Sequence, residues 1–434
     1  MRTGRHSVPD GRTHPGAAFA VAGAVAALPG TASAVPRTEE SDPVSYWDRP
    51  DTLRSPRWPR NVEFREHPPG VRRIFAIVLA VFLIGGVAAA VVAGREEQDS
   101  STATKTVRGV IGSEKAEFFG DPDVVEALAA RGYTVETETS GSWAMEGLDL
   151  KGYDFAFPSS RAPAEELARA HRVRRPLPRP FYSPLVVVAH RAAAEVLAGN
   201  GLAALGAKRS GTLDMAAFLD AAGDDRTWQQ LKGSRGHGEL SGTLFISSTD
   251  PTSSSSGALY LAAASYVADG GRVADGRAAV DRTAPLMRKL ISVQGAQQTS
   301  TDAAFGDFVS GAGNPLVLVY ESQVAALLTR GEDVGDLTVL YPDTTANSDH
   351  TVVPLTEEGR ALGELLGEDE ELRRLAIRHG FRPQGAAAEF TAATAGRTTY
   401  LDQKLTGVRQ VPVPASEVLR EMARRARDQE GDRT

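Results

Sequence analysis

The hydrophobic pattern of the chain changes character at about residue 107. From there onward, short apolar runs typical of strands alternate with segments of helical period. The expected strands cover residues 107–113, 134–139, 153–160, 181–190, 241–246, 314–322, 337–343 and 350–355. Strands separated by helices predict an α/β fold with sheets that are rich in parallel pairs.

Helix boundary signals lie between these strands. Asp121 is a good N-cap, Pro122 suits the first helical position, and Gly132 suits a stop. A second helix is expected to end at Gly380, and a C-terminal amphipathic helix is expected to be capped by Ser416. Other helices are expected at residues 161–171, 212–222, from 252–256 onward, and at 323–331.

Residues 74–94 form a run of 21 residues without a charge or a hydrogen-bonding side chain. At about 1.5 Å per residue, this run matches a hydrocarbon core of about 30 Å and predicts a transmembrane helix. A buried core helix is the alternative interpretation. Arg72 and Arg73 precede the run, so the positive-inside rule places the N-terminus in the cytoplasm and the body outside.

Another N-terminal segment bears on this topology. Residues 17–34 resemble a secretory signal peptide, and their cleavage would conflict with the charge bias around the later span. A start site placed too far upstream would also explain them. The preferred interpretation makes residues 1–73 a disordered cytoplasmic tail and residues 95–106 a polar linker.

Composition and charge narrow the chemistry. The chain has no cysteine, which excludes disulfides, a thiol nucleophile, thiolate-bound metals and a lipid-modified N-terminal cysteine. Before residue 74 there are 11 Arg, no Lys and 8 acidic residues, a net charge of +3. The whole chain carries −7, so the remainder carries −10. This charge disfavours nucleic acid as a partner and leaves anion binding to local dipoles.

Small hydroxyl residues follow several of the expected strands. Ligands of open α/β sheets bind beyond the carboxyl ends of strands, where helix N-termini offer unpaired N–H groups. The relevant residues are Ser113, Ser140, Ser142, Ser159, Ser160 and the run from Thr249 to Ser256. The run could bind an oxyanion without formal positive charge. Plain helix capping and a flexible low-complexity loop are equally open explanations for it.

Four segments, taken in order along the chain, resemble type II periplasmic solute-binding proteins. Together the resemblance covers about 280 residues, and its first segment contains the run from Thr249 to Ser256. They are TDPTSSSSGALYLAAASYV at 249–267, GNPLVLVYESQVAALL at 313–328, LTVLYPDTTANSDHTVVPL at 337–355 and LAIRHGFRP at 375–383. The chain looks most like the membrane-anchored branch related to phosphate- and molybdate-type binding proteins, including those that accompany von Willebrand factor A modules.

The resemblance implies two α/β lobes that close on a ligand. Lobe 1 would comprise residues 107–187 and 321–410, lobe 2 residues 188–320, and the C-terminal helix and tail residues 411–434. Residues 181–190 would make the first crossing between lobes, and residues 316–322 the return. The implied ligand-binding residues are Ser113, Ser140, Ser159, Ser160, Thr252, Ser253, Ser254 and Tyr320.

Two charged residues complicate an anion site. Glu321 would lie beside the cleft and repel an oxyanion, unless it caps the next helix or the ligand carries donor groups. Arg161 would supply the only nearby positive charge, although an arginine at a helix start is often merely solvated.

The expected function is a single-pass protein of the cell membrane whose extracytoplasmic body binds a small polar or anionic solute. No catalytic activity, metal or cofactor is expected, because the sequence has no HExxH pair, nucleophile elbow or complete phosphate-binding loop. A permease or a von Willebrand factor A protein would be the partner. A ligand-free bilobal scaffold and a hydrolase or transferase using a serine of 252–256 are the alternatives.

Overall fold

The computed structural model describes residues 104–206 and 208–428, which belong to one compact unit. The expected tail, the signal-peptide-like segment and the span at 74–94 lie outside the described residues. Within the described ranges, no helix is both long and apolar enough to cross a bilayer.

A four-stranded sheet forms the first lobe, with the order β11-β3-β1-β2. Strand β1 is parallel to β2 and β3, and β11 is antiparallel at the edge. The strands are β1 (Lys105–Ile111), β2 (Tyr133–Thr139), β3 (Phe155–Phe157) and β11 (Val353–Pro354). Its helices are α2 (Ala116–Gly120), α3 (Pro122–Ala130), α4 (Arg161–Ala170), α11 (Glu357–Glu368) and α12 (Glu370–Arg378).

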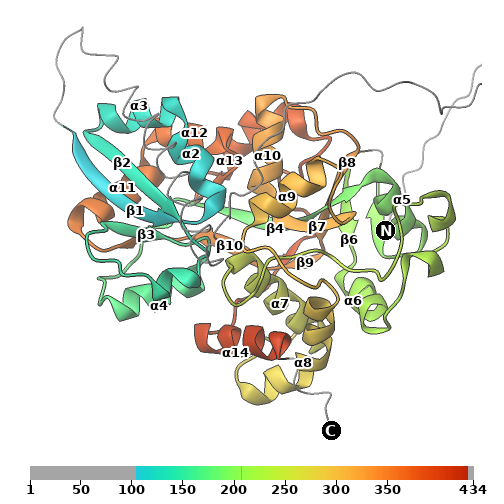
Figure 1. Ribbon diagram of the computed structural model, residues 1–434. Helices are drawn as coiled ribbons and strands as arrows, with labels where there is room; N and C mark the ends of the chain where they lie inside the picture. The colour runs from blue at the N-terminus through green and yellow to red at the C-terminus, as the bar shows by residue number, and fades with distance from the viewer. Residues whose placement is uncertain (1–103, 207, 429–434) are drawn as a thin grey trace, which may run out of the picture. The chain divides into compact units, whose positions relative to one another are not determined.

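Both faces of this small sheet are covered by helices (Figure 1). Val107 and Ile111 of β1 pack with α2, α3, α11 and α12, whereas Val110 faces α4. This alternation follows from the two-residue period of a strand. Asp121 caps α3 as predicted, because its side chain accepts the N–H of Asp123.

The second lobe is built on a seven-stranded sheet with the order β10-β4-β8-β6-β5, where β7 and β12 also pair with β4. The strands are β4 (Phe181–His190), β5 (Ala203–Leu205), β6 (Ser210–Leu213), β7 (Leu316–Tyr320), β8 (Leu337–Pro342), β10 (Asn347–His350) and β12 (Arg382–Pro383). A separate two-stranded pair joins β9 (Thr344–Thr345) to β13 (Arg409–Gln410).

Helices also cover both faces of this larger sheet. The buried side chains of α5, α6, α7, α8 and α14 share one core with the sheet, and those of α9 and α10 share another. The helices are α5 (Arg191–Gly199), α6 (Met215–Gly223), α7 (Ser255–Ala268), α8 (Arg277–Ser292), α9 (Thr301–Val309), α10 (Glu321–Arg330), α13 (Ala387–Ala393) and α14 (Ser416–Arg427).

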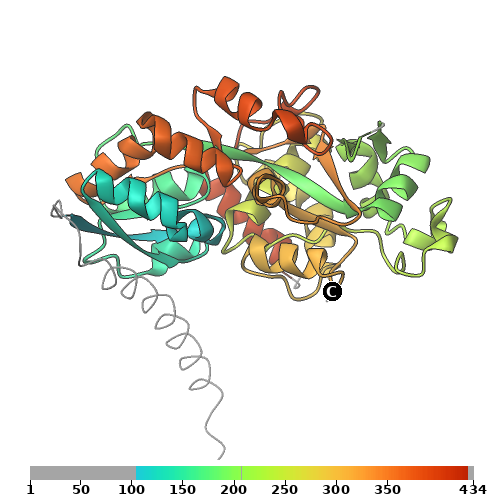
Figure 2. The ribbon, with the colours of Figure 1, turned by 90° about the horizontal axis from the view of Figure 1, so that it is seen from above.

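Strand β4 runs from one lobe into the other (Figure 2). Its first residues pair with β10 and β12, and its last residues pair with β7 and β8. Phe181 belongs to the core of the small sheet. Val187 and Val188 lie on opposite faces of the larger sheet, in separate cores. The first expected crossing therefore coincides with β4.

The return crossing differs from the expectation. Strand β7 stays beside the second half of β4, and the chain returns from β8 through β9 to β10. The expected lobe boundary at residue 320 also differs, because the buried side chains of α10 and β8 pack in the cores of the larger sheet.

Three local expectations were wrong. Residues 241–246 form no strand, because pairing in this region is limited to two isolated bridges, from Thr243 to Thr227 and from Ser247 to Val317 of β7. The larger sheet is mixed, since β4 is antiparallel to β7, β8, β10 and β12. The N-cap of α14 is Ala415, because the hydroxyl of Ser416 donates to Glu166 of lobe 1.

A buried ion pair joins the start of α10 to β12. The Arg382 guanidinium donates to both carboxylate oxygens of Glu321, over 2.6 and 2.8 Å. Tyr341 of β8 donates a third hydrogen bond to Glu321, and Arg382 also donates to the carbonyls of Asp402 and Gln403. Glu321 is therefore a structural residue that ties four segments together.

Removal of one member of this pair should be costly, because an ionised group would be left buried without its partner. We expect Arg382→Met to lower the free energy of unfolding by about 3–5 kcal/mol, measured by urea denaturation. The matched control is Arg374→Met, which breaks an ion pair between largely exposed side chains and should cost less than about 1 kcal/mol. Equal losses in both variants would contradict the structural role of Arg382.

Candidate interlobe binding site

The carboxyl ends of the three parallel strands of lobe 1 face lobe 2. Residues Ser113–Lys115 follow β1 as a short 3-10 helix, and Ser159 and Ser160 follow β3. Opposite them, lobe 2 presents the N-termini of α7 and α9 and the end of β7. Strand β10 contributes Ser348 and His350. We call the buried polar groups gathered here the interlobe site.

Two charged side chains lie at the centre of the interlobe site. Glu114 and Lys115 form an ion pair with side-chain exposures of 4% and 0%. Ser159 Oγ donates to Glu114 Oε1 over 2.6 Å, and Lys115 Nζ lies 3.2 Å from His350 Nδ1. The Lys115 ammonium also lies 4.8 Å from the centre of the Phe157 ring.

Electrostatics keep Glu114 ionised despite its burial. Burial alone would raise the pKa of Glu114, but the Lys115 charge and the hydrogen bonds from His350 and Lys115 hold that pKa well below its usual range. For His350, burial is the largest cause, and the Lys115 charge adds to it, so its pKa falls to about 4. His350 is therefore neutral at pH 7.

Neutral hydroxyls surround the charged pair. The phenol of Tyr320 lies among the hydroxyls of Ser348, Ser256 and Ser159, which come from β10, α7 and the end of β3. Burial, followed by the Glu114 charge, raises the pKa of Tyr320 and keeps its proton in place. Ser142 Oγ lies 3.2 Å from Ser159 Oγ and accepts the Ser159 N–H over 3.0 Å.

Direct contacts join the two lobes around this site. Ser113 bonds Ser300 over 2.9 Å, and Ser160 bonds Ser255 over 2.8 Å. The N–H of Trp143 donates to the carbonyl of Ser253 over 3.0 Å. The Trp143 ring packs with Ala258, Ala262 and Leu419, so α7 and α14 of lobe 2 cover it.

The structure brings only part of the expected residue set together. Ser159, Ser160 and Tyr320 belong to the interlobe site, and Ser254 reaches it through Ser256, 3.1 Å away. Ser113 of lobe 1 forms a hydrogen bond with Ser300 of lobe 2 beside the site. Their role in binding a ligand stays a prediction.

The hydroxyls of the other expected residues bond within their own segments. Thr252 is exposed and bonds Asp250 in the turn before α7. Ser253 gives its carbonyl to Trp143, and Ser140 Oγ donates to the carbonyl of Gly141 over 3.4 Å. The expectation for Arg161 also changes: Arg161 is 64% exposed and pairs with Glu165, and the buried positive charge is Lys115.

Sequence reasoning missed Glu114, Lys115, Ser256, Ser348 and His350. Glu114 and Lys115 directly follow Ser113, so their position after the first strand was an available signal. Their burial was not, because it depends on side chains of lobe 2 and β10 that cover them. His350 belongs to no metal-binding motif, so the sequence pattern did not single it out. Among residues 104–206 and 208–428, no group of three or more His, Asp or Glu could hold a metal.

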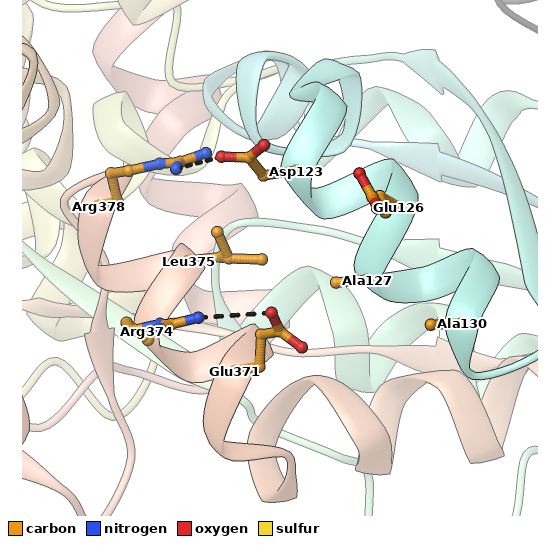
Figure 3. A pocket seen from close by; sticks show the side chains of 8 residues that line it. All are labelled: Asp123, Glu126, Ala127, Ala130, Glu371, Arg374, Leu375 and Arg378. Carbon is orange, nitrogen blue, oxygen red and sulfur yellow. Dashed lines mark hydrogen bonds and ion pairs between the residues drawn. The ribbon is translucent and has the colours of Figure 1, made fainter.

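Two surface cavities lie away from the interlobe site. One of about 570 Å³ runs between α3 and α12, where Arg378 pairs with Asp123 and Arg374 pairs with Glu371 around Leu375 (Figure 3). The other, of about 310 Å³, is lined by groups such as Lys208, Tyr341 and Lys404. Neither cavity is lined by any of the expected ligand-binding residues.

Comparison with known proteins gave structural similarities only. No family model and no curated protein matches the chain. The chain is similar to the sulfate-binding protein SubI from Mycobacterium tuberculosis, with 20% identity and a TM-score of 0.46, covering 72% of this chain and 93% of that one. It is also similar to AfuA from Actinobacillus pleuropneumoniae, a periplasmic binding protein with fructose 6-phosphate bound. There the identity is 11% and the TM-score 0.49, with 74% and 97% covered.

A third similar structure is iron-bound HitA from Pseudomonas aeruginosa, with 11% identity and a TM-score of 0.47, covering 74% of this chain and 99% of that one. The chain is thus similar to periplasmic substrate-binding proteins. These similarities do not address the expected membrane-anchored branch or the von Willebrand factor A link.

The buried His350 predicts a specific pH dependence of stability. Its pKa is about 4 in the folded protein, and the ordinary value of 6.5 applies on unfolding, so the unfolded chain binds the proton more readily. The contribution of neutral His350 is complete above about pH 6.5 and is lost as the pH falls to about 4, on the order of 3 kcal/mol.

We therefore expect His350→Asn to flatten the plot of unfolding free energy against pH between pH 6.5 and 4, measured by urea denaturation. Glu114, Lys115 and Asp349 are the charged groups that act on His350, and the variant retains them. His171→Asn changes an exposed histidine and should keep the wild-type slope. An unchanged slope in His350→Asn would contradict the burial of a neutral imidazole.

Proposed function

We propose that the protein is a solute-binding protein that holds a small polar or anionic ligand between its two lobes. The observation that carries this proposal is the interlobe site itself. Buried hydroxyls from both lobes meet there around Tyr320, and one of them, Ser159 Oγ, lies 3.4 Å from Nζ of Lys115, whose side chain has no exposed surface. A ligand in this position would contact both lobes at once, so it would favour the closed arrangement.

Selectivity in such a site would come from the number and positions of its hydrogen-bond donors and acceptors, which a ligand has to match. The hydroxyls of Ser159, Ser256, Ser348 and Tyr320 can each donate or accept, and a ligand that leaves one of them unpaired loses about 1–3 kcal/mol. Lys115 favours an anionic group. The proposal includes no catalytic step, because Ser254, Ser255 and Ser256 bond other hydroxyls rather than a base.

The proposal also includes a membrane anchor. Residues 74–94 would span the cell membrane once and hold the body outside the cytoplasm, where a permease would be the natural partner. The run of apolar residues and the arginines before it support this topology.

A specific observation also favours the scaffold alternative. The lobes already bond each other directly through Ser113–Ser300 and Ser160–Ser255, and Lys115 is already paired with Glu114. A bilobal body with these internal contacts could serve as a rigid interaction module, for example for a von Willebrand factor A partner.

Ligand screening separates the two functions. We expect full-length protein in mild detergent to gain thermal stability from at least one member of a panel of oxyanions, small carboxylates, sugar phosphates and other small metabolites. Isothermal titration calorimetry should then give a dissociation constant. The panel includes sulfate, fructose 6-phosphate and molybdate, because structures similar to this chain are a sulfate-binding protein, a protein with fructose 6-phosphate bound and a molybdate-binding protein.

The double variant Ser159→Ala/Ser256→Ala removes one hydroxyl from each lobe and should weaken binding by about 10-fold or more. Ser241→Ala, an exposed serine of lobe 2, should leave affinity unchanged. Failure of the whole panel, together with copurification of a non-permease partner from membranes, would support the scaffold instead.

The membrane anchor has its own test. We expect deletion of residues 74–94 to move the protein from the membrane fraction to the soluble fraction after alkaline carbonate extraction, because it removes the only long apolar run. Deletion of residues 17–34 is the control and should leave the protein in the membrane fraction. A membrane-bound protein after the first deletion, or a mature N-terminus near residue 35 by mass spectrometry, would contradict the proposed topology.

A further inference from the structure

The carboxylate of Glu114 is surrounded as a bound anion would be. Its Oε1 accepts from Lys115 Nζ and from Ser159 Oγ, the latter over 2.6 Å, and lies 3.4 Å from His350 Nδ1. These partners come from three elements: the segment after β1, the end of β3, and β10. Glutamate at a helix start usually points into solvent, whereas this one is 4% exposed.

Gly112 provides the space that this arrangement needs. A Cβ atom on Gly112 would lie 2.4 Å from Ser159 Oγ and 2.6 and 2.7 Å from the two oxygens of Glu114. The backbone of Gly112 is extended, with φ −67° and ψ 143°, so any residue could adopt it. The close approach of the carboxylate, rather than the backbone conformation, therefore requires glycine here.

Burial of this carboxylate costs free energy unless the surrounding donors all form hydrogen bonds or ion pairs with it. Removing an ionised carboxylate from water costs several kcal/mol, and only excellent ion-pair and hydrogen-bond geometry offsets that cost. The offsetting groups are Lys115, Ser159 and His350. Two of these groups, Lys115 and Ser159, are also the groups that we propose bind an external solute.

Charge permits only one anion at this place. Lys115 is the buried ammonium, and burial lowers the pKa of His350 so that its ring is neutral at pH 7. Asp302 is a further nearby carboxyl on the lobe 2 side, and burial, together with the Glu114 charge, raises its pKa. A second ionised group beside Glu114 would face repulsion in a medium of low dielectric constant.

We propose that Glu114 is an internal ligand: its carboxylate occupies the anion position of the interlobe site, and an external small carboxylate binds there only when Glu114 is displaced or removed. The contact between Glu114 and its donors is independent of the proposed function, whereas displacement of Glu114 by a solute rests on that function. The external ligand class that fits this position is a monoanion with a planar carboxylate, since that is the group the donors already surround.

Chemical rescue tests this inference. Glu114→Ala in the full-length protein should leave Lys115 unpaired and lower the melting temperature. Sodium formate should then bind in the freed space and raise the melting temperature of the variant saturably, by about 5 °C at about 100 mM. Sodium chloride at equal ionic strength corrects for screening, and acetate serves as a second probe.

Three controls define the expected pattern. Wild-type protein should show no saturable formate effect, because Glu114 already fills the position. Glu114→Ala/Lys115→Met should lose the effect, because the ammonium is gone. Glu126→Ala, which removes an exposed carboxylate on α3, should behave like wild type. An absent formate effect in Glu114→Ala, or an equal effect in the double variant, would overturn the inference.

A second variant covers the case in which Glu114→Ala does not fold. Glu114→Gln keeps the shape without the charge, so Lys115 holds the side chain less strongly, and formate should displace it and bind at least about 10-fold more tightly than it binds wild type. Equal formate affinity in Glu114→Gln and wild type would also overturn the inference. Formate rescue without binding of any panel solute to wild type would leave the internal ligand in place and reject only the solute-binding proposal.

Discussion

Strand β4 is the element on which the rest of the structure depends, because it is hydrogen-bonded on both sides along its length and contributes to three separate cores. Its first residues pair with β10 and β12, and its last residues pair with β7 and β8. Phe181 packs in the core of the small sheet, whereas Val187 and Val188 pack on opposite faces of the larger one. The lobes are therefore joined by shared backbone pairing.

A polar interface between two lobes has a strict requirement, which is that each buried group must find a partner. Hydroxyl groups meet this requirement easily, because each can both donate and accept a hydrogen bond. Ser160 bonds Ser255 and Ser113 bonds Ser300 without any net charge. The Glu114–Lys115 pair is different, since each of its members is costly to bury and becomes tolerable only through the other. The interface thus combines neutral hydroxyl contacts, in which either partner can donate, with one ion pair whose members must stay together.

The two buried ion pairs of the described chain have different surroundings. Glu321 and Arg382 are bidentate, and Arg382 also bonds two carbonyls, so that pair belongs to the framework. Glu114 and Lys115 are adjacent in sequence and lie where two lobes meet. A framework pair cannot be exchanged without unfolding, whereas a pair at an interface can be opened by movement of the lobes. This difference makes Glu114 a candidate for displacement and Glu321 a poor one.

Much of the local structure follows from the sequence. The Asp121 cap and the positions of most strands were predicted, because apolar periodicity and capping chemistry act over a few residues. Ser159, Ser160 and Tyr320 were predicted from their positions at strand ends, and the structure buries all three where the lobes meet. Thr252 was predicted by the same rule, but its hydroxyl donates to Asp250 in a turn. The failed strand at 241–246 shows the limit of a periodicity signal, since Leu244 and Ile246 are buried in the core without pairing as a strand.

The sequence by itself determined the positions of β1 to β4, β7 and β8, the hydroxyl-rich strand ends and the absence of thiol chemistry. Only the tertiary structure decided that β4 is antiparallel to its neighbours, that β8 and β10 bring the chain back, and that Glu114, Lys115 and His350 are buried together. The physical reason is that burial and pKa depend on what covers a side chain. For these three residues, the covering groups lie in segments that are distant in sequence.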